Sequence, residues 1–94
     1  EAIRIKPLKG GGMQRLGVAG VFIEIGLVPN SDLVRGLARL NAAGEIIVDC
    51  SCRTDVPGLF AAGDVTDVPE KQIVVAAGEG AKAALQAHRY LQKL

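Results

Sequence analysis

Apolar and charged positions alternate at the start of the chain and give way to apolar runs further along. Residues 2–6 (AIRIK) alternate between apolar and charged positions from Ile3 onward, which predicts a half-exposed β-strand. Residues 7–12 (PLKGGG) break the alternation with a proline and three glycines, so a solvated hairpin is expected here. Residues 18–25 (VAGVFIEI) carry Glu24 as their sole charge and predict a strand that is buried on both faces.

Turn-forming residues divide the middle of the chain into short elements. A short helix is expected over residues 32–35, with Asn30 or Ser31 as its cap. Apolar positions on both sides of a polar turn at residues 41–44 predict a hairpin over residues 37–49. The middle of the chain is therefore expected to be rich in turns.

The last third of the chain predicts a strand followed by a long helix. Residues 54–58 (TDVPG) have turn composition, and residues 59–62 (LFAA) predict a short buried strand that ends at Gly63 and Asp64. A helix is expected over residues 72–94, the longest periodic segment. Together these elements predict an α/β chain of a few strands, a hairpin and one long C-terminal helix.

The long helix is expected to be amphipathic, with an apolar face turned inward. That face consists of Ile73, Ala77, Gly80, Ala84, Ala87 and Leu91. The opposite face, expected to be solvated, consists of Glu79, Lys82, Gln86, Arg89 and Lys93. Glycine lowers helix propensity by about 1 kcal/mol relative to alanine, so the two glycines of this helix indicate close approach to a sheet or a ligand.

Composition narrows the class of protein. The chain has 94 residues, the size of one small domain or a piece of one. It is 49% hydrophobic and 22% charged, as is ordinary for a soluble globular chain. A net charge of +1 provides no strong field for nucleic acid or an anionic membrane, and no apolar run approaches the roughly 20 residues that span a bilayer. A cytoplasmic protein without nucleic-acid or membrane partners is expected.

Catalytic and metal-binding patterns are weak. His88 lies at the edge of the helix's apolar face and is expected to be packed or partly exposed. Ser31 and Ser51 belong to no nucleophile-elbow pattern. Asp64 and Asp67 form an Asp-x-x-Asp pair that could bind a metal, but this spacing is common. No catalytic residue and no metal ligand is therefore assigned.

Cys50 and Cys52 form a C-x-C pair. A disulfide between them would close a strained ring, so two reduced thiols are expected, with redox activity as the alternative. A zinc site would need about two further ligands, and His88 is the only other one of the usual soft kind.

The most informative cluster is the predicted strand that ends at Gly63 and Asp64, followed by the helix that starts near Gln72. Ligands of open α/β sheets bind beyond the carboxyl ends of the strands. A glycine there lets a ligand approach the backbone, and the Asp64 carboxylate offers acceptors to a polyol or a ribose diol. Free amides at the helix start can donate to an electron-rich ring or an anion. A cofactor site, a free-standing ribose-binding module and a plain structural turn all fit this pattern.

Several of these segments resemble a known family. Residues 54–65 (TDVPGLFAAGDV) resemble the C-terminal flavin motif of the pyridine nucleotide-disulfide oxidoreductases. Residues 69–73 (PEKQI) and 77–84 (AGEGAKAA) are similar to the thioredoxin reductase branch, and especially to the flavoprotein component of alkyl hydroperoxide reductase. Residues 20–30 (GVFIEIGLVPN) resemble the strand that returns from the NAD(P)H domain to the FAD domain.

The resemblance implies a fold and a cofactor site. Residues 1–15 would be a β-ribbon that ends the NAD(P)H domain, and residues 16–94 the C-terminal portion of a Rossmann-like FAD domain. Asp64 would accept a hydrogen bond from a ribityl hydroxyl of FAD, and the amides of Gln72 and Ile73 would face the isoalloxazine ring. Lys71 stands where the family commonly carries a basic residue. The implied cofactor-binding residues are Gly63, Asp64, Val65, Lys71, Gln72 and Ile73.

The resemblance also implies a function for the intact enzyme, which would move electrons from NAD(P)H through FAD to a disulfide. The chain lacks the family's G-x-G-x-x-G fingerprints and its C-x-x-C pair, so it corresponds to the last third of a reductase and is expected to be inactive alone. NAD(P)H would bind elsewhere. The implied partners are the rest of the FAD domain, the NAD(P)H domain, a thioredoxin- or peroxiredoxin-type protein disulfide, and a second copy in a homodimer. The alternative is a non-catalytic, free-standing binding or interaction module derived from that fold.

Overall fold

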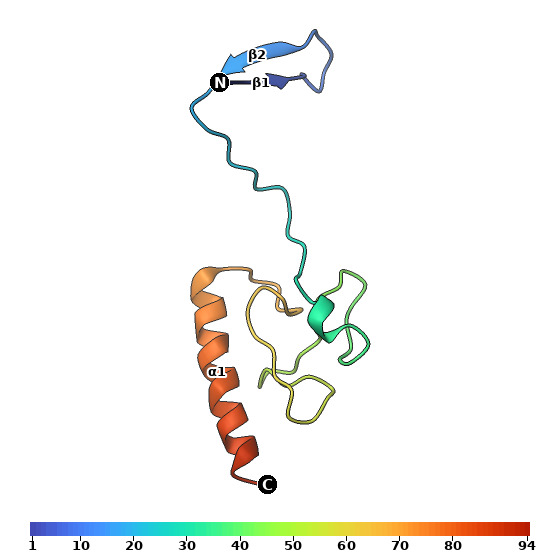
Figure 1. The fold of residues 1–94 in the computed structure, drawn as a ribbon, viewed down its shortest axis with the longest axis vertical. Coiled ribbons are helices and arrows are strands. Elements are labelled where there is room, and N and C mark those ends of the chain that lie inside the picture. Colours follow the sequence, from blue (N-terminus) through green and yellow to red (C-terminus); the bar gives the residue numbers. More distant parts are fainter.

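The computed structural model describes all 94 residues and has an elongated shape of 65 × 25 × 21 Å. A β-ribbon of β1 (Ala2–Ile5) and β2 (Gln14–Gly17) lies at one end of the molecule. An extended segment connects the ribbon to η1 (Asp32–Val34), a single 3-10 turn, and to the loops that pack against α1 (Ile73–Leu91) (Figure 1).

The β-ribbon confirms the strand predicted from the alternating pattern. β1 and β2 are antiparallel, with Ala2 opposite Gly17 and Ile5 opposite Gln14. The turn between the strands includes Gly10, whose φ of 89° favours glycine. The ribbon extends two residues beyond the expected boundary at residue 15.

The prediction of a buried strand over residues 18–25 is wrong for this chain. The segment is extended but joins no sheet, and its side chains face solvent: Phe22 is 94% exposed and Ile25 is 89% exposed. A strand buried on both faces needs neighbouring strands and a covering layer on each side. No other part of the chain supplies them, as the isolated path of this segment in Figure 1 makes plain.

The short helix and the hairpin in the middle of the chain are present in reduced form. Ser31 occupies the N-cap position of η1, but its hydroxyl donates to the carbonyl oxygen of Gly44 at 2.6 Å instead of capping the helix. The hairpin consists of one antiparallel bridge, between Leu40 and Ile46. Hydrogen bonds from these loops thus replace the regular strands that the pattern predicts.

The predicted strand over residues 59–62 is also reduced to a single bridge. Phe60 pairs antiparallel with Arg53, across a Pro-Gly turn in which Gly58 has a φ of 85°. Residues 59–62 are half-buried, because α1 covers one side of them only.

The long helix is confirmed, but the orientation predicted for its faces is wrong. Ile73 and Leu91, expected inside, are 91% and 65% exposed. Glu79, Lys82 and Gln86, expected in solvent, are half-buried against the loops. Hydrophobic spacing identifies the apolar side of a helix. Which side is buried depends on where the other segments of the chain pack, and here the loops pack against the side that carries Glu79, Lys82 and Gln86.

The buried core is small for a chain of this length. Only five of the 94 residues are buried, namely Ser31, Ala38, Ile46, Cys52 and Thr66. The accessible surface is 7480 Å², whereas a folded monomer of this mass exposes about 5,200 Å². The radius of gyration is 19.6 Å, against about 12 Å for a compact domain of this length. None of the helices is both long and apolar enough to cross a membrane.

Candidate functional site

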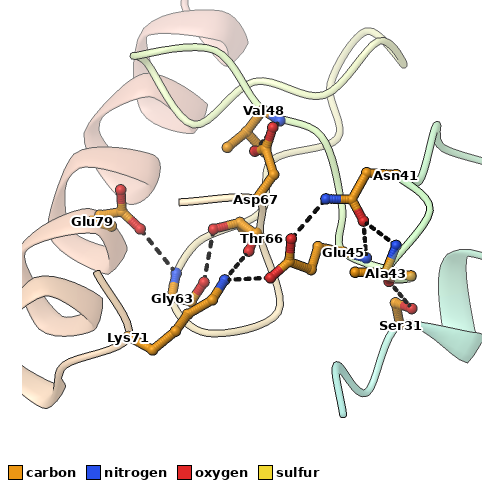
Figure 2. A network of polar contacts seen from close by, with 11 residues as sticks. Ser31, Asn41, Ala43, Glu45, Val48, Gly63, Thr66, Asp67, Lys71 and Glu79 are labelled. Carbon is orange, nitrogen blue, oxygen red and sulfur yellow. Dashed lines mark hydrogen bonds and ion pairs between the residues drawn. The ribbon is translucent and has the colours of Figure 1, made fainter. Parts of the chain in front are cut away.

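Gly63 is held tightly against the first turns of α1. Its amide donates to the carboxylate of Glu79 at 3.2 Å, and its φ is 79°. A Cβ at this position would lie 3.3 Å from the Cβ of Ala76 and would be strained by that φ. Thr66 closes the loop, because its hydroxyl donates to the Gly63 carbonyl oxygen at 2.7 Å (Figure 2). The glycine therefore fixes the loop where it meets the helix.

Lys71, one residue before the helix cap, ties the same loop to the hairpin. Its ammonium group donates to the carbonyl oxygen of Thr66 and forms an ion pair with Glu45 at 2.9 Å. The Asn41 amide donates to the other carboxylate oxygen of Glu45 at 2.6 Å (Figure 2). The hydrogen bond from Asn41, followed by the one from Lys71, lowers the pKa of Glu45 below its ordinary value. The Lys71 side chain thus links the loop at Thr66 to Glu45 of the hairpin.

Val65 and Asp67 contribute to the fixed part of the site through backbone contacts. The Val65 carbonyl oxygen accepts from the Ile46 amide at 2.9 Å, and the Asp67 amide donates back to Ile46 at 3.0 Å. The carboxylate of Asp67 accepts from the Val48 amide at 3.1 Å. Asp64, between these two residues, is exposed, and its carboxylate forms no hydrogen bond within the chain. Asp64 and Asp67 therefore have different surroundings.

The start of α1 presents free donors beside this loop. Gln72 is the N-cap residue in an extended conformation, without a capping hydrogen bond from its side chain. The first intrahelical bond runs from the Ala76 amide to the Gln72 carbonyl oxygen at 2.9 Å, so the amides of residues 73–75 have no partner within the helix. No acidic side chain lies in the first turn. Free amides on one side and a free carboxylate on the other suit a ligand with hydroxyl groups and an electron-rich ring.

Glu79 makes a contact that the sequence pattern does not predict. The helical spacing places it on the solvated face, whereas its carboxylate holds Gly63 and its carbonyl oxygen accepts from the thiol of Cys52 at 3.6 Å. The glycines on either side of Glu79 give no signal for this contact: close approach to a sheet or a ligand is expected there, but nothing lies within 4 Å of a Cβ placed at Gly78 or Gly80. The contact of Thr66 with Gly63 leaves no signal in the sequence either.

The two cysteines have different environments. Cys50 is exposed, and Cys52 is 1% exposed with a φ of 60°. Burial raises the pKa of the Cys52 thiol above its ordinary value. Both are free thiols, one facing solvent and the other the interior. His88 is exposed, and no group of three or more potential metal ligands comes together.

Comparison with known proteins places this chain in a family. Residues 1–80 match the family model described as pyridine nucleotide-disulphide oxidoreductase. The chain is 56% identical over 86 residues to the F subunit of alkyl hydroperoxide reductase of Xanthomonas campestris pv. phaseoli, covering 92% of this chain and 16% of that protein. It is 52% identical over 81 residues to the corresponding protein of Escherichia coli K12, covering 86% of this chain and 16% of that protein.

Solved structures agree with this assignment. The crystal structure of Lactococcus lactis thioredoxin reductase matches 99% of this chain and 31% of its own, with a TM-score of 0.80 and 38% identity. The crystal structure of T. acidophilum thioredoxin reductase matches 98% of this chain and 30% of its own, with a TM-score of 0.79 and 38% identity. The chain therefore belongs to the pyridine nucleotide-disulphide oxidoreductases, a family of flavoprotein oxidoreductases.

Proposed function

We propose that this chain is the C-terminal, FAD-binding portion of an NAD(P)H:disulfide oxidoreductase of the alkyl hydroperoxide reductase flavoprotein type. Residues 1–15 would end the NAD(P)H domain, and residues 16–94 would complete the FAD domain. The chain spans 16% of the length of the two alkyl hydroperoxide reductase relatives named above. The activity, the cofactors and the partners of the whole protein are accordingly part of the proposal.

One observation carries the proposal. The exposed Asp64 carboxylate and the unpartnered amides at the start of α1 both lie next to the contact between Gly63 and α1. The exposed carboxylate of Asp64 would accept from a ribityl hydroxyl, and the first amides of α1, which lack partners within the helix, would face the pyrimidine side of the flavin ring. Gly63 and Val65 keep this edge fixed through Glu79 and Ile46. Bound FAD would supply the hydride and electron-pair chemistry that links NAD(P)H to a disulfide.

The remaining parts of the proposed enzyme lie outside this chain. NAD(P)H would bind to another part of the polypeptide, and the electron acceptor would be a thioredoxin- or peroxiredoxin-type protein disulfide. A cytoplasmic homodimer is the proposed assembly. The exposed apolar residues of segment 18–30 and of α1 support a larger folded unit, because these surfaces need cover.

Replacement of Asp64 by alanine in the full-length protein tests the proposal. A charge-assisted hydrogen bond contributes about 1.5–3 kcal/mol. Asp64→Ala should therefore weaken FAD affinity by roughly ten- to a hundredfold. The measurement is flavin retained after dialysis, with circular dichroism to verify folding.

The matched control is Asp32→Ala, which removes an exposed carboxylate whose ion pair with Arg35 lies on the surface. Surface pairs of this kind are worth less than about 1 kcal/mol, so this variant should retain flavin like the wild type. Equal flavin affinity in wild type and folded Asp64→Ala would remove Asp64 from the site.

A further inference from the structure

A pocket lies at the opposite end of α1 from the Gly63 loop. Its volume is about 480 Å³, and it is formed between residues 51–60 and the last turns of the helix. None of the residues proposed for flavin binding lines it. Seventeen residues separate Ile73 from Tyr90, which corresponds to about 26 Å along the helix axis. The pocket is therefore a separate site, and an inference about it does not depend on the proposed function.

One wall of the pocket is apolar and well fixed. The rings of Phe60 and Tyr90 pack edge to face, with their centroids 6.2 Å apart. The Tyr90 ring also covers Gly58, where an added Cβ would lie 3.1 Å from the ring. Val56 and Leu59 complete this wall. The ring of Tyr90 is thus held by the Pro-Gly turn on one side and by Phe60 on the other.

The remaining side of the pocket is cationic. Arg53, Arg89 and Lys93 line it, and no carboxylate does. One nitrogen of the Arg53 guanidinium donates to the Gln86 side chain at 3.0 Å, which holds the group while its other donors stay available.

Three negative contributions lie nearby and do not cancel these three charges. Asp55, in the segment of residues 51–60, does not line the pocket, and its carboxylate accepts from the Arg39 amide at 2.9 Å. Asp49 directs its carboxylate to the amides of Ser51 and Arg53, at 2.8 and 2.9 Å, and the bond from the Arg53 amide lowers its pKa. The C-terminal end of α1 adds roughly half a negative charge. Glu79 and Lys82 act on Cys52 further along the helix and do not line the pocket. The balance at the pocket stays positive.

We propose that this pocket binds a small organic anion that combines an aromatic body with a phosphate or carboxylate group. Its volume falls in the range of about 300–1,000 Å³ that is usual for small-molecule sites. The apolar wall would contact the aromatic body, and the guanidinium groups of Arg53 and Arg89 would bind the anionic group through paired hydrogen bonds. Lys93 would add a third, more mobile charge.

Phenyl phosphate is a suitable probe, titrated into the full-length protein by calorimetry with inorganic phosphate and phenol as separate comparisons. Phenyl phosphate should bind at least tenfold more tightly than either. The double variant Arg53→Gln/Arg89→Gln should lose at least tenfold in affinity. The control Arg35→Gln/Arg39→Gln removes two exposed cations outside the pocket and should bind like the wild type.

A second measurement uses the wild type alone and so does not depend on the folding of the variants. Phenylglyoxal modifies accessible arginines, and phenyl phosphate should protect Arg53 and Arg89 but leave Arg35 and Arg39 reactive, as read by peptide mass mapping. Lack of protection at Arg53 and Arg89 would overturn the proposal. Equal affinity for inorganic phosphate would overturn the aromatic part of it, and binding of an acidic peptide without binding of phenyl phosphate would replace the small anion with a protein partner.

Discussion

At the scale of single residues, hydrogen bonds from small buried polar side chains hold the loops in place in a chain whose apolar core is small. Two of the five buried residues are Ser31 and Thr66, and each hydroxyl donates to a backbone carbonyl oxygen. No buried side-chain polar atom lacks a partner. A buried polar group without a partner would destabilise the fold by about 1–3 kcal/mol. These two hydroxyls therefore secure the loops around Gly44 and Gly63.

The two cysteines give a prediction at the same scale. Cys52 is almost inaccessible and its pKa is raised by burial, whereas Cys50 is exposed. Thiolates are the reactive form, so Cys52 should react with a thiol reagent at least tenfold more slowly than Cys50 in the folded chain. Absorbance after addition of Ellman's reagent measures both rates.

In denaturant, both thiols should react quickly. Without denaturant, the folded Cys50→Ser variant should show only the slow reaction of Cys52. Fewer than two free thiols in freshly purified, non-reduced protein would contradict the interpretation of Cys50 and Cys52 as unbonded.

At the scale of elements, the link from Asn41 through Glu45 to Lys71 connects the hairpin to the start of α1, and it should respond to pH. The pKa of Glu45 is lower in the folded chain than in the unfolded one, where it is about 4.3. The carboxylate therefore stabilises the fold above that pH, and the contribution is lost as the pH falls through the lowered pKa.

Glu45→Gln should accordingly flatten the fall in unfolding free energy on acidification. Urea unfolding between pH 3 and pH 7, followed by the circular dichroism of α1, measures this. The control is Glu70→Gln, which changes an exposed carboxylate without a side-chain partner and should leave the acid dependence as it is. Identical acid dependence in wild type and Glu45→Gln would show that the link does not stabilise the chain.

The elements also show how far sequence reasoning reaches. β1, the Pro-Gly turn at Gly58 and the long helix are predictable because alternation, turn residues and helical periodicity act over neighbouring residues. The exposure of residues 18–25 and the buried face of α1 are not, because each depends on which distant segments lie against it. The sequence pattern places Gly63 at the end of a predicted strand, whereas its φ of 79° and its contact with Glu79 are known only from the structure.

At the scale of the molecule, the exposed surface exceeds that of a typical monomer by about 2,300 Å² and includes large apolar residues such as Phe22, Ile25 and Ile73. Family membership and this surplus agree with a chain that folds as part of a larger unit. Segment 18–30 and the exposed apolar residues Ile73 and Val74 at the start of α1 are the surfaces that such a unit would cover.

The isolated 94-residue chain should therefore have no NAD(P)H-dependent disulfide reductase activity, because the fingerprints for both dinucleotides and the C-x-x-C pair are absent from its sequence. Oxidation of NADH or NADPH at 340 nm, with FAD and a protein disulfide added, measures this. The full-length protein provides the positive control. Turnover by the isolated chain would contradict the proposal that NAD(P)H and the redox-active cysteine pair belong to other parts of the polypeptide.

The packing of Tyr90 between Gly58 and Phe60 gives the chain a built-in optical reporter. Tyr90 is the only tyrosine and the chain has no tryptophan, so ultraviolet fluorescence of the isolated chain arises almost wholly from this ring. Separation of the Pro-Gly turn from the last turns of α1 would change the surroundings of the ring directly. Tyrosine emission and near-ultraviolet dichroism therefore follow the docking of that turn without any label, while far-ultraviolet signals follow the helix itself.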